Sequence, residues 1–206
     1  MNKTRKKHWE EVYQTRKPDE VSWYQLDPSV SLDLIASTGI THEQEIIDVG
    51  AGASVLVDKL LDKGFQDITV LDISAKAIQC AKERLAQRAE NVTWLEADIT
   101  QFEPPQQYDL WHDRAVFHFL TDQIERRKYI NVMKDSLHKG SHVIISAFSL
   151  EGPLKCSGLD VERYDSEKLW WELGSSFELV KSIEEVHITP WQAEQKFIYC
   201  YFRKNG

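Results

Sequence analysis

The sequence predicts an α/β fold in which helices cover both faces of a mostly parallel, seven-stranded sheet that ends in an antiparallel hairpin. From Glu45 onward, short apolar runs alternate with amphipathic stretches, which is typical of parallel strands joined by crossover helices. The last two apolar runs have no long helical stretch between them, so they predict a hairpin around Thr189 and Pro190. A length of 206 residues with 42% hydrophobic residues suits one domain with a substantial core.

Seven apolar runs predict the strands of this sheet, at residues 45–49, 67–71, 92–96, 108–111, 142–148, 177–187 and 196–203. Three stretches with apolar residues at helical spacing predict helices, at residues 54–63, 75–87 and 121–137. Ser74 and Thr121 stand where helix N-caps belong, and Lys139 followed by Gly140 is a typical stop signal for the third helix. The apolar faces of the first two helices can therefore lie on the sheet.

The bulk composition narrows the classes of partner. Lys and Arg number 25 against 33 Asp and Glu, and the net charge of −8 disfavours nucleic acid and anionic membrane surfaces. Cys80, Cys156 and Cys200 are too widely spaced for a disulfide framework or a zinc knuckle, so we expect a reducing cytoplasm and no metal. No stretch approaches the roughly 18 apolar residues of a membrane span, and the basic start lacks the apolar segment of an export signal.

The most informative segment is the turn after the first predicted strand. Asp48, Gly50 and Gly52 stand in the pattern D-x-G-x-G-x-S, which ends at Ser54. The glycines let the backbone turn tightly and approach a ligand, while the N-terminus of the next helix offers free N–H groups. The spacing departs from the G-x-G-x-x-G of dinucleotide sites. A tight strand-to-helix connection without a ligand is the alternative interpretation.

Two further acidic residues follow the next two predicted strands. Asp72 stands about 20 residues beyond the glycine turn, where a carboxylate can accept hydrogen bonds from both hydroxyls of a ribose. A helix N-cap is the alternative role for that position. Asp98 follows the third strand. Three carboxylates without Lys or Arg at the glycine turn would repel a pyrophosphate and favour a cationic ligand.

The order and spacing of these motifs resemble the class I S-adenosylmethionine methyltransferases, with Ser54 in place of the usual third glycine of their motif I. The resemblance covers residues 45–148 and implies a Rossmann-like fold, S-adenosyl-L-methionine as cofactor and S-adenosyl-L-homocysteine as product. It implies that Asp98 accepts from the adenine amino group and that the backbone of Ile99 meets the ring. The expected cofactor contacts are Asp48, Gly50, Gly52, Asp72, Ile73, Asp98, Ile99, His112 and Trp23.

The segment after the fourth predicted strand is expected to face the transferred methyl group. His112-Asp113-Arg114-Ala115, followed by an aromatic and apolar run, is similar to the Trp-Asp-Arg-Gly segment of the thiopurine and thiol S-methyltransferases. This resemblance implies that Arg114 pairs with an anionic or polarised acceptor, and that Asp113 orients the acceptor or receives a proton. His112 is a candidate general base. A structural ion pair between Asp113 and Arg114 is the alternative.

The N-terminal segment is rich in Trp, Tyr and charge and is interrupted by Pro18 and Pro28, which favours a lid over a linker. We expect Trp23 to contact the cofactor, because stacked rings exclude water and attract a sulfonium. A helix that docks an aromatic stripe on the core would explain the same residues. The turn-rich segment 151–159, which includes Cys156, is predicted to roof the acceptor pocket.

We therefore expect a single methyltransferase domain over residues 1–206. It would comprise a lid at 1–44, a cofactor-binding core at 45–148, and a substrate-side insertion with the C-terminal hairpin at 149–206. The favoured acceptor is a small molecule with a thiol or a related soft nucleophile. Methylation of a protein lysine or another nitrogen is the enzymatic alternative, and a regulatory module that binds the cofactor without acceptor chemistry is the alternative from another class.

Overall fold

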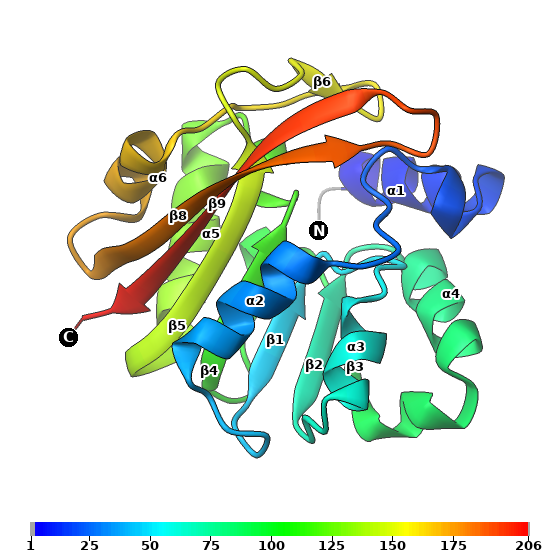
Figure 1. Cartoon of the computed structure of the whole chain (residues 1–206). Coiled ribbons are helices and arrows are strands. Elements are labelled where there is room, and N and C mark those ends of the chain that lie inside the picture. Colours follow the sequence, from blue (N-terminus) through cyan, green and yellow to red (C-terminus); the bar gives the residue numbers. More distant parts are fainter. Residues whose placement is uncertain (1–2, 206) are drawn as a thin grey trace.

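The computed structural model describes residues 3–205 and confirms the predicted seven-stranded sheet (Figure 1). The strand order is β3-β2-β1-β4-β5-β9-β8, in which the first five strands are parallel and β9 runs antiparallel to both of its neighbours. The strands are β1 (Ile46–Val49), β2 (Ile68–Asp72), β3 (Val92–Glu96), β4 (Tyr108–Arg114), β5 (Leu137–Phe148), β8 (Phe177–Ile188) and β9 (Glu194–Lys204). A separate pair, β6 (Lys155–Cys156) and β7 (Leu159–Asp160), lies in the segment after β5.

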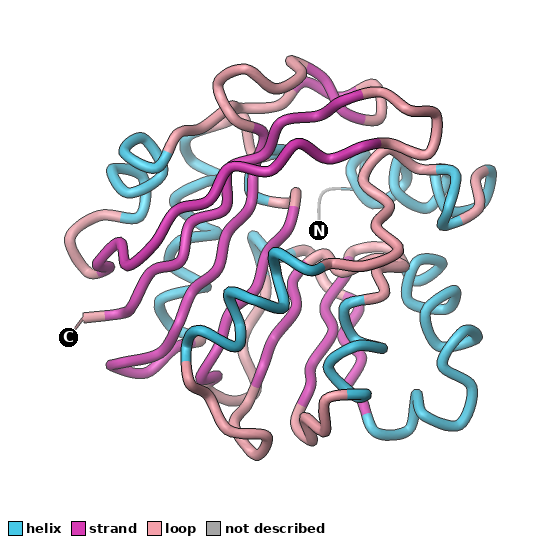
Figure 2. The backbone as a smooth tube through the Cα atoms, viewed as in Figure 1, coloured by secondary structure: helices cyan, strands magenta, loops and turns pink. Residues whose placement is uncertain are grey.

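Helices cover both faces of this sheet, as expected, and α1 with the loop after it lies at the carboxyl ends of the parallel strands (Figure 2). One face carries α2 and α3, and the other carries α5 and α6. A further helix, α1, packs beside α4 at the carboxyl edge. The helices are α1 (Lys3–Thr15), α2 (Ser29–Thr38), α3 (Leu56–Asp62), α4 (Ala75–Leu85), α5 (Gln123–Asp135) and α6 (Ser166–Leu173). Short 3-10 turns follow at Pro18–Glu20, Ala86–Asn91, Ile99–Gln101 and Phe117–Phe119.

The central strands are apolar along their whole length because helices bury both of their faces. Ile46 packs into the core under α2 and α3, while its neighbour Ile47 packs into the core under α5. Successive side chains of a strand point to opposite faces, so a strand buried on both sides reads as a continuous apolar run. This is why short apolar runs predicted the strands correctly.

The boundaries of the third predicted helix were wrong at both ends. The N-cap is Asp122 rather than Thr121, because Oδ1 of Asp122 accepts hydrogen bonds from the N–H groups of Ile124 and Glu125, at 2.8 and 3.1 Å. The helix ends at Asp135, and β5 already begins at Leu137, where it pairs with Tyr108 of β4. The Lys139-Gly140 signal therefore lies inside a strand, where Gly140 adopts a φ of +89°.

Two further differences bear on the site. Strand β4 runs three residues beyond its predicted end and carries His112, Asp113 and Arg114 within the sheet before the chain turns at Ala115, where φ is +70°. Residues 1–44 were predicted to form a lid, but α2 within this range buries Leu34 and Ile35 in the core. No helix in residues 3–205 is long and apolar enough to cross a membrane.

Candidate active site

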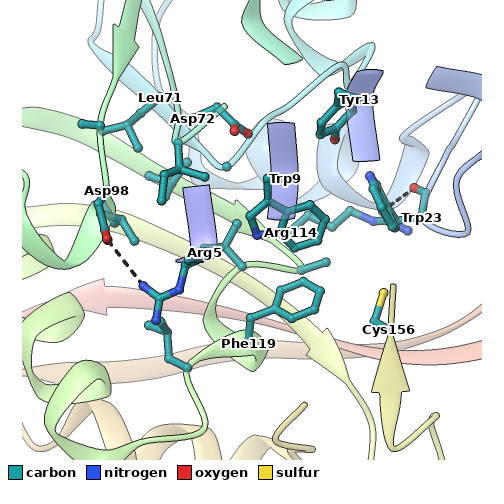
Figure 3. A pocket seen from close by; sticks show the side chains of 18 residues that line it. Arg5, Trp9, Tyr13, Trp23, Leu71, Asp72, Asp98, Arg114, Phe119 and Cys156 are labelled. Atoms are coloured by element: carbon teal, nitrogen blue, oxygen red, sulfur yellow. Dashed lines mark hydrogen bonds and ion pairs between the residues drawn. The ribbon is translucent and has the colours of Figure 1, made fainter. Parts of the chain in front are cut away.

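Two adjoining pockets lie where the parallel strands end, and residues of α1 and of the segment after it line both of them. Figure 3 shows the first of these pockets. Both pockets are lined by Tyr13, Trp23, Val49, Gly50 and Arg114, so they form two chambers of one site. The first chamber extends over the ends of β2 and β3 to Asp72, Ile73, Asp98 and Ile99. The second extends over β1 and β4 to Asp48 and His112.

The glycine turn after β1 separates the two chambers and has no room for larger side chains. Gly50 and Gly52 adopt φ values of +61° and +56°, which residues with a side chain rarely do. A Cβ on Gly50 would lie 1.9 Å from Cγ2 of Val116, and a Cβ on Gly52 would lie 2.4 Å from the hydroxyl oxygen of Tyr13. The turn therefore needs glycine both for its conformation and for the close approach of the lid.

Asp72 ties the end of β2 to the glycine turn. Its Oδ2 accepts a hydrogen bond from the N–H of Gly52 at 2.8 Å, and its Oδ1 accepts one from the N–H of Ser74 at 2.8 Å. Burial raises the pKa of this carboxyl group to about 6, in spite of the two hydrogen bonds. The helix N-cap is Ser74, whose side chain accepts from Ala77, so Asp72 is not the cap of α4.

The second chamber holds a buried pair of polar side chains. Nδ1 of His112 lies 2.7 Å from Oδ1 of Asp48, and Nε2 of His112 lies 2.9 Å from Oγ of Ser31 on α2. The other carboxylate oxygen, Oδ2 of Asp48, is buried and has no hydrogen-bond partner among the described residues. A buried carboxylate oxygen without a donor is costly, so this atom marks a place where a ligand donor would be stabilised.

The far end of the first chamber is apolar with one acidic group. Ile73 and Ile99 line it, and Asp98 follows β3. Oδ1 of Asp98 accepts hydrogen bonds from the N–H and the hydroxyl of Thr100, at 3.0 and 2.8 Å, and lies 3.5 Å from Nη1 of Arg5. This combination of an apolar slot and a carboxylate suits a flat heterocycle with an exocyclic amino group.

The rings of the N-terminal segment form one wall of the first chamber. Trp9 on α1 packs edge-on against Trp23 and Phe119, with ring centroids 5.6 and 5.0 Å apart. The carboxylate of Glu10 anchors this helix, because it accepts hydrogen bonds from the N–H groups of Ala75 and Lys76 at the start of α4, at 2.7 and 3.2 Å. The segment thus packs on the core and also lines the pocket, and the contact of Trp23 with a cofactor stays a prediction.

The predicted trio His112, Asp113 and Arg114 does not share one environment. Asp113 is fully buried and does not line either chamber. Its carboxylate accepts hydrogen bonds from the N–H groups of Val116 and Phe117, at 2.9 and 3.1 Å, and from the hydroxyl of Tyr129 at 2.5 Å. Strand alternation explains this placement, because neighbouring residues of β4 point to opposite faces.

Arg114 does line both chambers, and it makes no ion pair with Asp113. Its Nε donates to the hydroxyl oxygen of Tyr199 on β9, and its Nη1 donates to the carbonyl oxygen of Trp23, both at 2.8 Å. The alternative of a structural Asp113–Arg114 ion pair was therefore wrong. Sequence reasoning did not find the residues that hold Arg114, because a hairpin strand some 85 positions away supplies Tyr199.

His118 packs inside the protein, where it is fully buried. Its Nδ1 accepts a hydrogen bond from the N–H of Phe148 at 3.2 Å, and its ring contacts those of Phe119 and Phe148. Burial lowers the pKa of His118 to about 3, so the ring stays neutral at physiological pH. This histidine belongs to the core beneath the pocket.

Comparison with known proteins assigns the family. A protein-family model described as a methyltransferase domain matches residues 40–200. The chain belongs to this family. The match and the fold confirm the prediction of a class I, S-adenosylmethionine-dependent methyltransferase, and they favour an enzyme over a regulatory binding module. The resemblance to the thiopurine and thiol S-methyltransferases is not shown.

Three similar proteins illustrate the breadth of relatives of this methyltransferase. The eEF1A lysine and N-terminal methyltransferase of Bos taurus is 32% identical over 58% of this chain and 17% of its own length. The malonyl-[acyl-carrier protein] O-methyltransferase 1 of Ilyobacter polytropus is 30% identical over 53% of this chain and 40% of its own. The N-methyltransferase NodS of Bradyrhizobium japonicum, solved with S-adenosyl-L-homocysteine, has a TM-score of 0.74 at 17% identity, covering 97% of this chain and 100% of that one. The methyltransferase thus spans less than half the length of these two curated relatives.

Proposed function

We propose that this methyltransferase binds S-adenosylmethionine across both chambers and transfers its methyl group to a small-molecule acceptor. The unpartnered Oδ2 of Asp48 is the observation that carries the proposal. S-adenosylmethionine has an ammonium group on its methionine part and a positive sulfonium, and the carboxylates of the site suit both charges. The adenosine part would occupy the first chamber and the methionine part the second.

The proposed contacts follow from the geometry of each chamber. The carboxylate of Asp72 would accept from the ribose hydroxyls, with Ile73 beside the ring. Asp98 would accept from the adenine amino group, with Ile99 against the base. Gly50 and Gly52 would let the backbone approach the cofactor. The remaining contacts would come from Asp48 and Trp23, and His112 would orient the carboxylate of Asp48.

His112 and Asp113 take positioning roles in this proposal, and only Arg114 keeps a direct role toward the acceptor. Both ring nitrogens of His112 are engaged, with Asp48 and with Ser31, so the ring orients the carboxylate that binds the cofactor. Asp113 holds the turn that follows β4. A thiol fits a site of this kind, because its thiolate is accessible near neutral pH without a dedicated base.

A protein lysine is the second candidate acceptor, favoured by the match to the eEF1A methyltransferases. A lysine ammonium would have to lose a proton before it could attack the methyl group, and it would have to approach the guanidinium of Arg114. Both requirements make it less suited to this pocket than a neutral or anionic acceptor.

The three cysteines are free thiols, which supports our proposal that the protein works in the cytoplasm.

The test is methyl transfer from radiolabelled S-adenosylmethionine. The purified methyltransferase is incubated with a panel of small thiols and, separately, with a lysate whose small molecules have been removed. The proposal expects label in small thioethers, and it expects Asp72→Ala to abolish that label. Label in a protein band alone would favour the lysine acceptor, and absence of S-adenosylhomocysteine binding by calorimetry would overturn the cofactor assignment.

A further inference from the structure

The guanidinium of Arg114 is a feature of the site to which the proposed function assigns no cofactor contact. Its plane is fixed by stacking on Phe197, with Cζ 4.7 Å from the ring centroid. Nε and Nη1 donate to Tyr199 and to the carbonyl of Trp23. Nη2 is buried and makes no hydrogen bond to any described residue. Arg114 lines both chambers, and its fixed guanidinium keeps a donor that no described residue uses in a hydrogen bond.

The surroundings of Arg114 hold it in place without neutralising it fully. Oε2 of Glu185 accepts a hydrogen bond from the Tyr199 hydroxyl at 3.0 Å and lies 3.9 Å from Nη2 of Arg114. Oε1 of the same carboxylate accepts from Nε2 of Gln25 at 3.0 Å. Glu185 therefore forms an ion pair with Arg114 but no hydrogen bond to it, and both hydrogen bonds of its carboxylate named above come from neutral donors.

The other basic groups of the site are already engaged. Arg5, the second arginine in the first chamber, lies against Asp98 and Glu125. His187 faces the same region from β8, and its Nε2 lies 2.7 Å from the carbonyl oxygen of Ser22, so this nitrogen donates to the backbone. Cys156, which lines the first chamber, has its thiol pKa raised to about 11 by burial, so it stays protonated and does not compete for the methyl group.

We infer that the acceptor carries a carboxylate and that this group binds Nη2 of Arg114. The inference rests on the proposed function, because it places the acceptor beside the methyl group of a bound S-adenosylmethionine. An arginine with two fixed donors and an Nη2 that makes no hydrogen bond recognises a carboxylate better than a neutral group, since charge-assisted hydrogen bonds are the stronger ones. Tyr199 is a positioning residue that aims the guanidinium.

The proposed methyl transfer needs no side chain to accept a proton from the acceptor. The thiol loses its proton to solvent before transfer, and the thiolate sulfur then attacks the methyl carbon. A new sulfur–carbon bond forms, the sulfonium–methyl bond breaks, and its electron pair stays on the cofactor sulfur. The thiolate charge and the sulfonium charge cancel, and the products are a thioether and S-adenosylhomocysteine.

The test compares three acceptors of matched length that differ in charge: mercaptopropionate, mercaptopropanol and aminopropanethiol. We expect kcat/KM for the anionic thiol to exceed that of the neutral thiol by about tenfold or more, and the cationic thiol to be the poorest. Arg114→Gln should bring the ratio of anionic to neutral thiol close to one. Because the ratio compares two acceptors on the same folded variant, partial unfolding does not change it.

Controls separate this inference from the proposed function. Arg203→Gln removes an exposed arginine of β9 outside the pocket and should leave the ratio unchanged. Tyr199→Phe should lower the ratio while S-adenosylhomocysteine affinity stays within about twofold of wild type. Equal rates with the anionic and neutral thiols, or an unchanged ratio in Arg114→Gln, would overturn the inference and leave the proposed function intact. If the wild-type protein transfers methyl to none of the three thiols, that result would instead count against the proposed function.

Discussion

Nδ1 of His112 lies 2.7 Å from Oδ1 of Asp48, and this contact decides what both residues can do. The opposite ring nitrogen lies 2.9 Å from Oγ of Ser31, so the imidazole bridges β1 and α2 beneath the second chamber. Oδ2 of Asp48, a residue that lines the second chamber, is left without a hydrogen-bond partner among the described residues, whereas both ring nitrogens of His112 are engaged. In the proposed function, His112 holds the carboxylate of Asp48 in the orientation that binds the cofactor.

Asp48→Asn should weaken S-adenosylhomocysteine binding by about tenfold or more, because the variant loses a charge-assisted hydrogen bond to the ammonium group. Isothermal titration calorimetry at neutral pH measures this change. Asp62→Asn, at an exposed position of α3, is the matched control and should bind like wild type. An affinity of Asp48→Asn within about twofold of wild type would reject the assignment of this oxygen.

His112→Ala should act through Asp48, and a double-mutant cycle can show this. The single change should weaken S-adenosylhomocysteine binding, because the carboxylate loses the side chain that orients it. In the Asp48→Asn background the same change should have a much smaller effect on the dissociation constant. Independent, additive effects of the two substitutions would show that His112 contacts the cofactor through another route.

Cofactor affinity should depend on pH through Asp72. The pKa of this carboxyl group is raised to about 6 by burial, and the ionised form is the one that accepts from ribose hydroxyls. Protonation therefore competes with S-adenosylhomocysteine, so affinity should be full above pH 7 and should fall as the pH drops through about 6. The Asp72→Asn variant should bind S-adenosylhomocysteine weakly, and its affinity should not fall further as the pH drops. An identical pH profile of affinity in wild type and variant would show that Asp72 does not cause the pH dependence.

Gly52→Ala should displace the lid, because the new Cβ would lie 2.4 Å from the hydroxyl oxygen of Tyr13. We expect weaker S-adenosylhomocysteine binding by calorimetry, and partial recovery in the Gly52→Ala, Tyr13→Phe double variant, which lacks that oxygen. Gly39→Ala is the matched control for backbone strain, since Gly39 has a φ of +77° with open space around it. If the double variant binds S-adenosylhomocysteine as weakly as Gly52→Ala alone, the cause is the altered turn and not the contact with Tyr13.

Asp113→Ala should lower the free energy of unfolding by about 2 kcal/mol or more, because it leaves two buried backbone N–H groups and the Tyr129 hydroxyl without their acceptor. Tyr129→Phe should cost less, since it removes only one of those three bonds. Urea unfolding measures both. A stable Asp113→Ala protein that binds S-adenosylhomocysteine but fails in methyl transfer would restore Asp113 as a catalytic residue.

Much of the cofactor half of the site could be predicted from the sequence, because it is built from local motifs. Asp48, Gly50 and Gly52 are consecutive in one turn, and Asp72 ends the strand that pairs with it, so spacing alone places them together. The parallel order of β1, β2 and β3 then brings Asp98 to the same edge. These residue assignments as cofactor ligands remain predictions.

The acceptor half could not be predicted in the same way, because distant segments build it. Whether a residue after β4 faces the pocket depends on where the strand ends. Because β4 continues to Arg114, neighbouring side chains still point to opposite faces there, and Asp113 lies in the core. The partners of Arg114 come from β8, β9 and the N-terminal segment, at positions such as Glu185, Tyr199 and Trp23. No sequence spacing relates these residues.

A crystal structure of the complex with S-adenosylhomocysteine tests the central claim most directly. The account predicts that both ribose hydroxyls contact the carboxylate of Asp72, and that the amino group of the homocysteine part lies within hydrogen-bonding distance of Oδ2 of Asp48. A nucleoside bound elsewhere, or one whose amino group points away from Asp48, would contradict it.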